Sequence, residues 1–231
     1  MTTAPTPAEI AGMIDHTVLK PDTDEPTVRR VINEAVEHRF ASVCINPKWV
    51  SLTAEQLAGT GVRTCTVVGF PLGATTTAQK VTEAQEAIAE GADEIDMVVD
   101  IADANTLAAD AVQGQIAAIA AATHAGGAIL KVILETALLS EEAKRLVCQA
   151  AEAAGADFVK TSTGFAGGGA TVEDIALMHQ EVGGRLGIKA SGGVRTYQDA
   201  VAVINAGATR IGASSSLDIV GVGNPSSDGG Y

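Results

Sequence analysis

The chain is poor in aromatic residues, in cysteine and in long apolar runs. Only 3% of its 231 residues are aromatic, although 46% are hydrophobic, so a core must be built from aliphatic side chains. Such a core suits buried parallel strands. The three cysteines, Cys44, Cys65 and Cys148, are scattered and form no Cys-x-x-Cys or Cys/His cluster. This pattern predicts reduced thiols in a cytoplasmic protein, without a disulfide framework or a zinc site.

Basic surfaces and targeting segments are also absent. The net charge of −13 argues against nucleic acid or an anionic membrane as a partner. No apolar run approaches the roughly 18 residues of a membrane span. Met1–Pro7 has neither the basic nor the apolar region of a signal peptide. The four histidines lie in separate segments, so we expect no metal site, and no cofactor is expected either.

What the sequence does contain is a repeated unit of helix, glycine and aliphatic strand. Copies begin at Glu90, Ala154 and Ala206, and a looser copy covers Gly126–Ile133. In each copy the glycine ends a helix and the strand follows at once. Eight strands are expected, at Ile14–Val18, Ala41–Ile45, Thr64–Val68, Glu94–Val99, Ile129–Leu134, Phe158–Thr161, Gly187–Ala190 and Thr209–Ile211. Helices are expected before and between them, at Pro7–Met13, Glu25–His38, Asn46–Leu57, Thr76–Glu90, Ala104–Thr123, Ser140–Ala154, Thr171–Val182, Tyr197–Ala206 and Ser214–Val220.

Eight strands that alternate with helices favour an α/β protein with a single (β/α)8 TIM barrel. We expect this catalytic domain over residues 1–221, with Pro7–Met13 as a short extra N-terminal helix. A doubly wound open sheet is the alternative, but no Gly-x-Gly-x-x-Gly follows the first strand. Residues 222–231 are rich in glycine and serine and are expected to form a flexible tail.

Charged side chains interrupt the apolar strands four to seven: Asp96, Lys131, Lys160 and Lys189. Neighbouring strands lie about 4.8 Å apart, so inward lysines on strands six and seven would come close together. Burial and a second ammonium both favour a neutral amine, which is a carbonyl nucleophile. Lys160 is therefore the candidate nucleophile, with Asp96 as acid or base and Lys131 as its partner. Alternatively, some of these side chains point outward, with their stems covered by helices.

Glycine and serine follow the last strands, where a TIM barrel usually binds phosphate. Gly192 and Gly193 follow strand seven, and Ser214 and Ser215 follow strand eight. Gly164, after strand six, adds another backbone amide. These five residues are the candidate phosphate site. The alternative is that they form ordinary strand-to-helix turns, in which glycine and serine are common.

Several of these motifs together resemble the deoxyribose-phosphate aldolase family. The matching stretches keep the family's order over nearly the whole chain, and the fifth and sixth are highly specific together: Ile14–Thr17, Val43–Pro47, Gly91–Asp96, Leu130–Ile133, Phe158–Gly164, Gly192–Thr196 and Gly212–Ser215. The resemblance implies a class I aldolase that reversibly cleaves 2-deoxy-D-ribose 5-phosphate to acetaldehyde and D-glyceraldehyde 3-phosphate. Its partners would be small phosphosugars and aldehydes. The oligomeric state stays open, with a homodimer among the options.

The resemblance also implies roles for individual residues. Lys160 would form the Schiff base, Asp96 and Lys189 would move protons through a bound water, and Lys189 would favour the neutral amine of Lys160. Lys131 would pair with Asp96. The residues that would line the substrate are Asp15, Thr17, Cys44 and, from the tail, Tyr231. Those that would hold its phosphate are Gly164, Gly192, Gly193, Ser214 and Ser215.

Two residues deserve separate expectations. Phe165 stands where some family members carry a lysine near the phosphate, which affects phosphate affinity rather than the aldol chemistry. Cys44, if it lines the site, is expected to be captured by reactive aldehydes.

Two other functions are alternatives for this set of residues. Another Schiff-base aldolase or a transaldolase would share Lys160 but not the Lys189 partner. A catalytically silent phosphosugar-binding barrel would need neither lysine.

Overall fold

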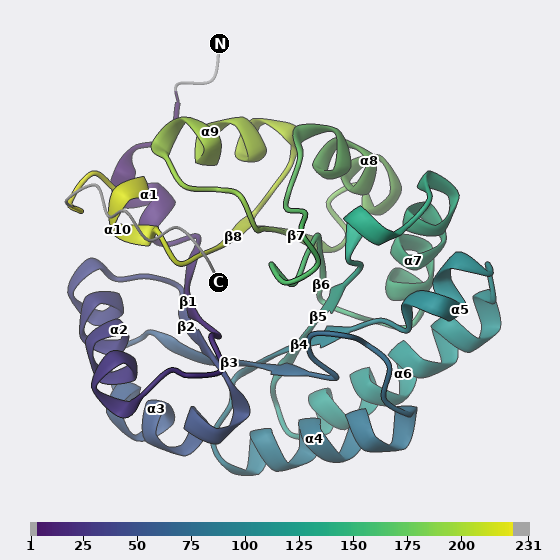
Figure 1. The fold of residues 1–231 in the computed structure, drawn as a ribbon, viewed down its shortest axis with the longest axis horizontal. Helices are drawn as coiled ribbons and strands as arrows, with labels where there is room; N and C mark the ends of the chain where they lie inside the picture. The colour runs from purple at the N-terminus through teal and green to yellow at the C-terminus, as the bar shows by residue number, and fades with distance from the viewer. Residues whose placement is uncertain (1–3, 224–231) are drawn as a thin grey trace.

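The computed structural model describes residues 4–223, which form a closed barrel of eight parallel strands in sequence order (Figure 1). The strands are β1 (Ile14–Val18), β2 (Ser42–Ile45), β3 (Arg63–Val68), β4 (Glu94–Val98), β5 (Ile129–Ile133), β6 (Phe158–Lys160), β7 (Gly187–Ser191) and β8 (Arg210–Ala213). Each strand pairs with the next, and β8 pairs with β1. The expected (β/α)8 barrel is thus confirmed, and the open doubly wound sheet is excluded.

Helices form a ring around this barrel, as Figure 1 shows. The helices are α1 (Pro7–Ala11), α2 (Glu25–His38), α3 (Val50–Leu57), α4 (Thr77–Ala89), α5 (Ile101–Asn105), α6 (Ala109–Ala125), α7 (Glu141–Ala153), α8 (Val172–Val182), α9 (Tyr197–Ala206) and α10 (Ser216–Ile219). Two 3₁₀ turns, η1 (Pro47–Trp49) and η2 (Thr136–Leu138), complete the described elements. The helix α1 precedes β1 and is the extra N-terminal helix that the sequence predicts.

Side-chain caps explain where the helices begin. The Asp24 side chain accepts a hydrogen bond from Thr27 N, and Ser140 does the same for Ala143 N. Thr76 forms a capping box with Gln79 at the start of α4. These oxygens satisfy backbone N–H groups that have no partner within the helix.

One helix prediction is wrong in detail. The stretch Ala104–Thr123 reads as one helix, but the structure has α5 and α6, with a break around Leu107. Leu107 adopts a positive φ of 58°, which cannot continue a right-handed helix. Asp100 starts α5 earlier than expected, because its side chain accepts from the N–H groups of Ala102 and Asp103. The sequence also places helix at Asn46–Leu57, where the structure begins with a 3₁₀ turn.

The aliphatic core lies between the barrel and its helices. On α2, Val28, Val31, Ile32 and Ala35 are buried at helical spacing and form one apolar face. Successive side chains along a strand point to opposite faces of the sheet. On the outer face, aliphatic side chains such as those of Ile95 and Met97 pack in this layer. The other face of the strands points into the barrel, and on β4 to β7 it carries the buried charged residues Glu94, Asp96, Lys131, Lys160 and Lys189.

The ends of the described chain leave two expectations open. Of the expected tail 222–231, only Val222 and Gly223 are described, and Tyr231 lies outside the described residues.

Among the described residues, no helix has the length and apolarity needed to cross a bilayer.

Candidate active site

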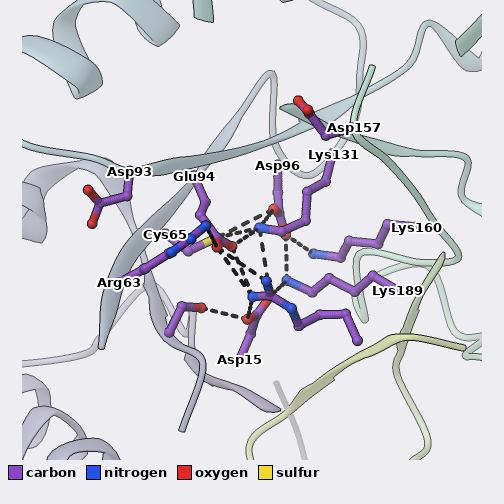
Figure 2. Close-up of polar contacts among 12 residues, drawn as sticks. Asp15, Arg63, Cys65, Asp93, Glu94, Asp96, Lys131, Asp157, Lys160 and Lys189 are labelled. Carbon is purple, nitrogen blue, oxygen red and sulfur yellow. Dashed lines mark hydrogen bonds and ion pairs between the residues drawn. The ribbon is translucent and has the colours of Figure 1, made fainter. Parts of the chain in front are cut away.

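Charged side chains from six strands meet inside the barrel (Figure 2). They are Asp15 on β1, Glu94 and Asp96 on β4, Lys131 on β5, Lys160 on β6, Lys189 on β7 and Arg210 on β8. All except Arg210 are buried, and Arg210 keeps 12% of its side-chain surface exposed. The alternative in which the strand lysines point outward is therefore wrong. The fold collects the predicted charges at one place.

Asp96 lies at the centre of this cluster. Its Oδ1 accepts from Lys131 Nζ at 2.7 Å, and its Oδ2 accepts from both Lys160 and Lys189 at 2.7 Å. Burial alone would raise the pKa of Asp96, but the three ammonium groups outweigh burial and hold the pKa well below its usual range. Asp96 is therefore an ionised carboxylate that can accept a proton.

A second carboxylate, Asp15, holds Lys189 from the opposite side. Lys189 Nζ lies 2.5 Å from Asp15 Oδ2, and Arg210 donates to Asp15 Oδ1 at 2.6 Å. Ser42 Oγ also donates to Asp15 Oδ1, at 2.7 Å. Burial would lower the pKa of Lys189, but the carboxylates of Asp15 and Asp96 raise it above its ordinary value. Lys189 is consequently a firmly charged ammonium.

Lys160 differs from the other two lysines in its partners. Among the described residues, Lys160 pairs with one carboxylate, whereas Lys189 pairs with two and Lys131 with three. Lys160 is also the one of the three with measurable exposure, at 3%. The lysine with the weakest anionic support is thus the candidate nucleophile.

Residues that the sequence reasoning missed extend the cluster away from Lys160. Glu94 Oε2 lies 2.6 Å from Lys131 Nζ and 3.1 Å from an Arg210 guanidinium nitrogen. Arg63 contacts Glu94 at 3.3 Å, with 55% of its side chain exposed. The period of two along a strand offered a signal, because Glu94 precedes Asp96 by two residues and shares its face.

Two cysteines that are distant in sequence meet beside Asp96. Cys44 and Cys65 are register partners on β2 and β3, and Cys65 Sγ lies 3.3 Å from both Asp96 Oδ1 and Lys131 Nζ. Cysteines that are scattered in the sequence are thus adjacent in the barrel. A hydrogen bond with Cys65 lowers the pKa of the Cys44 thiol, and burial raises the pKa of Cys65.

This pair also brings potential metal ligands together. Donor atoms of Cys44, Cys65 and Asp96 lie within 4.8 Å of one another, all buried. The Asp96 carboxylate already binds three ammonium groups, whose charge opposes a metal cation at this point. The arrangement favours proton transfer between side chains.

The loops after β6, β7 and β8 enclose a cavity of about 340 Å³. It is lined by Gly164, Gly167, Gly168, Gly169, Gly192, Gly193, Val194, Arg195, Ser214 and Ser215. Gly164 and Gly192 have φ angles of 88° and 83°, which only glycine adopts readily. A Cβ on Gly169 would lie 2.5 Å from Gly192 O, so two loops pack backbone to backbone. The five predicted glycine and serine residues thus share one cavity with Arg195, to which the sequence reasoning assigned no role.

Buried side chains hold these loops from behind. His16 Nδ1 lies 2.8 Å from Ser216 Oγ, and His16 Nε2 lies 2.7 Å from Glu34 Oε2. Ser216 begins α10 directly after the serines of the cavity. On the other side, Glu135 accepts hydrogen bonds from the backbone N–H and the hydroxyl of Thr163. The sequence offered no pattern that would identify these supports.

The remaining predicted residues lie around the cluster. Thr17 is buried, and its hydroxyl donates to Asp15 O at 2.8 Å. Thr17 also lines a neighbouring cavity of about 540 Å³, together with Ser214 and Ser215. Phe165 is 40% exposed and packs edge-on against Phe70, with 5.3 Å between ring centroids.

Fold and site together define a (β/α)8-barrel aldolase with a lysine cluster in its interior. The sequence profile described as "DeoC/LacD family aldolase" matches residues 10–221, and the chain belongs to this family. The deoxyribose-phosphate aldolase of Micrococcus luteus is 56% identical over 96% of this chain and 99% of its own length. That of Bacillus subtilis is 52% identical over 96% of this chain and 99% of its own.

A solved structure agrees with these sequence relatives. The deoxyribose phosphate aldolase of Aeropyrum pernix, described as having a unique tetrameric structure, is 34% identical. It superposes with a TM-score of 0.87 over 93% of this chain and 91% of that one.

Proposed function

We propose that the chain catalyses the reversible cleavage of 2-deoxy-D-ribose 5-phosphate to acetaldehyde and D-glyceraldehyde 3-phosphate, through a Schiff base on Lys160. One observation carries this proposal: a buried lysine with a single carboxylate partner, next to a second, firmly charged lysine. Relatives named deoxyribose-phosphate aldolase at 52% and 56% identity support the choice of substrate.

The reaction begins at Lys160. Its neutral amine attacks the aldehyde carbon of the open-chain sugar and forms a carbon–nitrogen bond, and a proton that Lys189 supplies through a bound water lets the hydroxyl leave as water. The product is an iminium ion. When the bond between C2 and C3 breaks, its electron pair moves into the iminium and gives an enamine.

Asp96 and Lys189 handle the protons of this step. Asp96, which is ionised, takes the proton of the C3 hydroxyl through a bound water as D-glyceraldehyde 3-phosphate forms. Asp96 then returns this proton to the enamine carbon through the same water. Hydrolysis of the iminium releases acetaldehyde, restores the Lys160 amine and gives the first proton back to Lys189. Lys189 donates a hydrogen bond to Asp96 at 2.7 Å, so both proton-transfer groups share one place in the site. Lys131 and Asp15 hold this pair in place.

The glycine-lined cavity is the proposed phosphate site. Gly164 lies four residues beyond Lys160 on the same chain segment, so a phosphate in the cavity would anchor a sugar that extends toward Lys160. Backbone amides at Gly164, Gly192 and Gly193 would bind its oxygens, and Arg195 would supply positive charge. Ser214 and Ser215 add hydroxyl donors. Thr17, Cys44 and Tyr231 remain proposed substrate-lining residues.

One experiment separates this function from its alternatives. The protein is incubated with acetaldehyde, reduced with borohydride and digested, and the modified residue is located by mass spectrometry. Reduction should fix an ethyl group on Lys160. The absence of an adduct there would overturn the Schiff-base mechanism and favour a silent phosphosugar-binding barrel. An adduct without cleavage of 2-deoxy-D-ribose 5-phosphate would indicate a different Schiff-base aldolase.

We also propose a cytoplasmic homodimer. The cysteines of the described residues are free thiols, which suits a reducing compartment. The A. pernix relative is described as tetrameric, which supports self-association in the family. Light scattering coupled to size-exclusion chromatography would give the mass of the assembly, and a monomer would overturn the homodimer.

A further inference from the structure

The buried ion cluster of the barrel has unequal numbers of positive and negative groups. Its four cations are Lys131, Lys160, Lys189 and Arg210, and its three carboxylates are Asp15, Glu94 and Asp96. With every group ionised, one unit of positive charge is left over. Excess charge in a buried site is costly, because water does not screen it.

Loss of one proton from Lys160 would restore the balance. Lys189 and Lys131 have two and three carboxylate partners, whereas Lys160 has one. Arginine does not deprotonate in proteins. The lysine that must be neutral for Schiff-base formation is therefore the one whose deprotonation neutralises the cluster.

Glu94 and Arg210 supply two of these charges without facing Lys160 directly. Arg210 donates to Asp15 at 2.6 Å and lies 3.1 Å from Glu94, and Glu94 lies 2.6 Å from Lys131. We propose that Glu94 and Arg210 are positioning residues of the aldolase reaction, whose opposite charges offset each other and so preserve the one excess positive charge that opposes a proton on Lys160. The proposal rests on the proposed function of Lys160.

Ionisable groups from all eight strands act on this balance. They are Asp15 on β1, Cys44 on β2, Arg63 and Cys65 on β3, Glu94 and Asp96 on β4, Lys131 on β5, Lys160 on β6, Lys189 on β7 and Arg210 on β8. The Cys65 thiol stays neutral at pH 7, because burial raises its pKa well above the ordinary value. Arg63 is half exposed, so solvent screens its charge.

The test uses two variants of opposite sign. Arg210→Met removes a cation, which favours the protonated form of Lys160 and should move the acidic limb of the kcat/KM profile to higher pH. Glu94→Gln removes an anion and should move the same limb to lower pH. A unit charge several ångströms away, partly screened, should move the limb by on the order of one pH unit. The double variant should return the limb toward its wild-type position.

Two control variants separate charge from packing. Arg210→Lys keeps the charge and should retain the wild-type profile. Arg63→Met removes a solvated charge from the same region and should shift the profile much less. Shifts of both single variants in the same direction, or none in either, would overturn the proposal. If Glu94→Gln does not fold, identical profiles for Arg210→Met and Arg210→Lys would overturn it.

The borohydride adduct distinguishes failure of this inference from failure of the proposed function. If wild-type protein forms no adduct at Lys160, the Schiff-base function itself is wrong. If the adduct forms and the variants keep the wild-type pH profile, only the role of Glu94 and Arg210 is lost.

Discussion

Lys160 and Lys189 donate to the same oxygen atom, Asp96 Oδ2, each at 2.7 Å. The two lysines are also register partners on β6 and β7. Their ammonium groups are therefore joined through a carboxylate, and a proton can pass from one to the other by way of Asp96. When Lys160 becomes an iminium or a neutral amine, Asp96 keeps Lys189 and Lys131 as partners. The relay thus survives each stage of the reaction.

Replacing either of these lysines should abolish or strongly reduce turnover. Lys160→Leu removes the nucleophile, so no cleavage above background is expected, while circular dichroism should show an intact fold. Lys189→Leu removes the proton donor for the loss of water at Lys160 and should reduce kcat by roughly 100- to 10,000-fold. Lys144→Leu is the matched control, because Lys144 pairs with Asp174 outside the cluster. Normal activity of Lys189→Leu at pH 7 would refute its role.

Cys44 should be the site of inactivation by aldehydes. It lies inside the barrel next to Cys65, whose hydrogen bond lowers the pKa of the Cys44 thiol and so favours the reactive thiolate. We expect wild-type protein at high acetaldehyde to lose activity and to carry an adduct on Cys44. Cys44→Ser should keep its activity longer, whereas Cys148→Ser should be inactivated like wild type, since burial raises the pKa of Cys148 to about 12. Full wild-type activity without an adduct would contradict this expectation.

The sequence predicted the barrel because its signals are local. A glycine after each repeated helix and an aliphatic run behind it are readable one segment at a time, and four such copies among eight expected strands leave few alternatives. The same reading failed at Leu107, where a positive φ splits a helix without a glycine or proline to mark the break. Single-residue conformations of this kind depend on packing around them.

The four charged residues at the centre of the site could be predicted from local sequence, but the residues that support them could not. Asp96, Lys131, Lys160 and Lys189 are conspicuous because each interrupts an apolar strand. Pairs such as Cys44 with Cys65, or His16 with Ser216, depend on register and on contacts between segments up to 200 residues apart. Only the closed barrel shows which of these residues meet.

Arg195 should contribute to binding of the phosphate rather than to the aldol chemistry. It lines the glycine-rich cavity together with the glycine and serine residues of the proposed phosphate site. Arg195→Gln should raise KM for 2-deoxy-D-ribose 5-phosphate by about 10-fold or more, a loss of roughly 1.4 kcal/mol. The kcat/KM for unphosphorylated 2-deoxy-D-ribose should change little, and the surface variant Arg29→Gln should leave both values unchanged. Equal losses for both sugars would place Arg195 outside the phosphate site.

Lys80 should make the stability of the fold depend on pH in the alkaline range. Lys80 lies on α4 and its side chain is fully buried. Its ammonium donates to Val98 O on β4 at 2.8 Å and to Gln115 Oε1 on α6 at 3.0 Å. Burial lowers the pKa of Lys80 to about 8, although nearby acidic groups oppose this. In the unfolded chain a lysine titrates near pH 10.4. Between these two values the unfolded state binds more protons, so this group increases the stability of the fold as pH rises.

The measurement is a difference between two proteins, so that other titrating groups cancel. The free energy of unfolding is obtained from urea titrations of wild type and Lys80→Met at several pH values from 7 to 10.5. Wild type should gain on the order of 2–3 kcal/mol relative to the variant across this range. Lys20→Met, which removes an exposed lysine, should show a nearly constant difference. A constant difference for Lys80→Met as well would mean that Lys80 is equally protonated in the folded and unfolded chains.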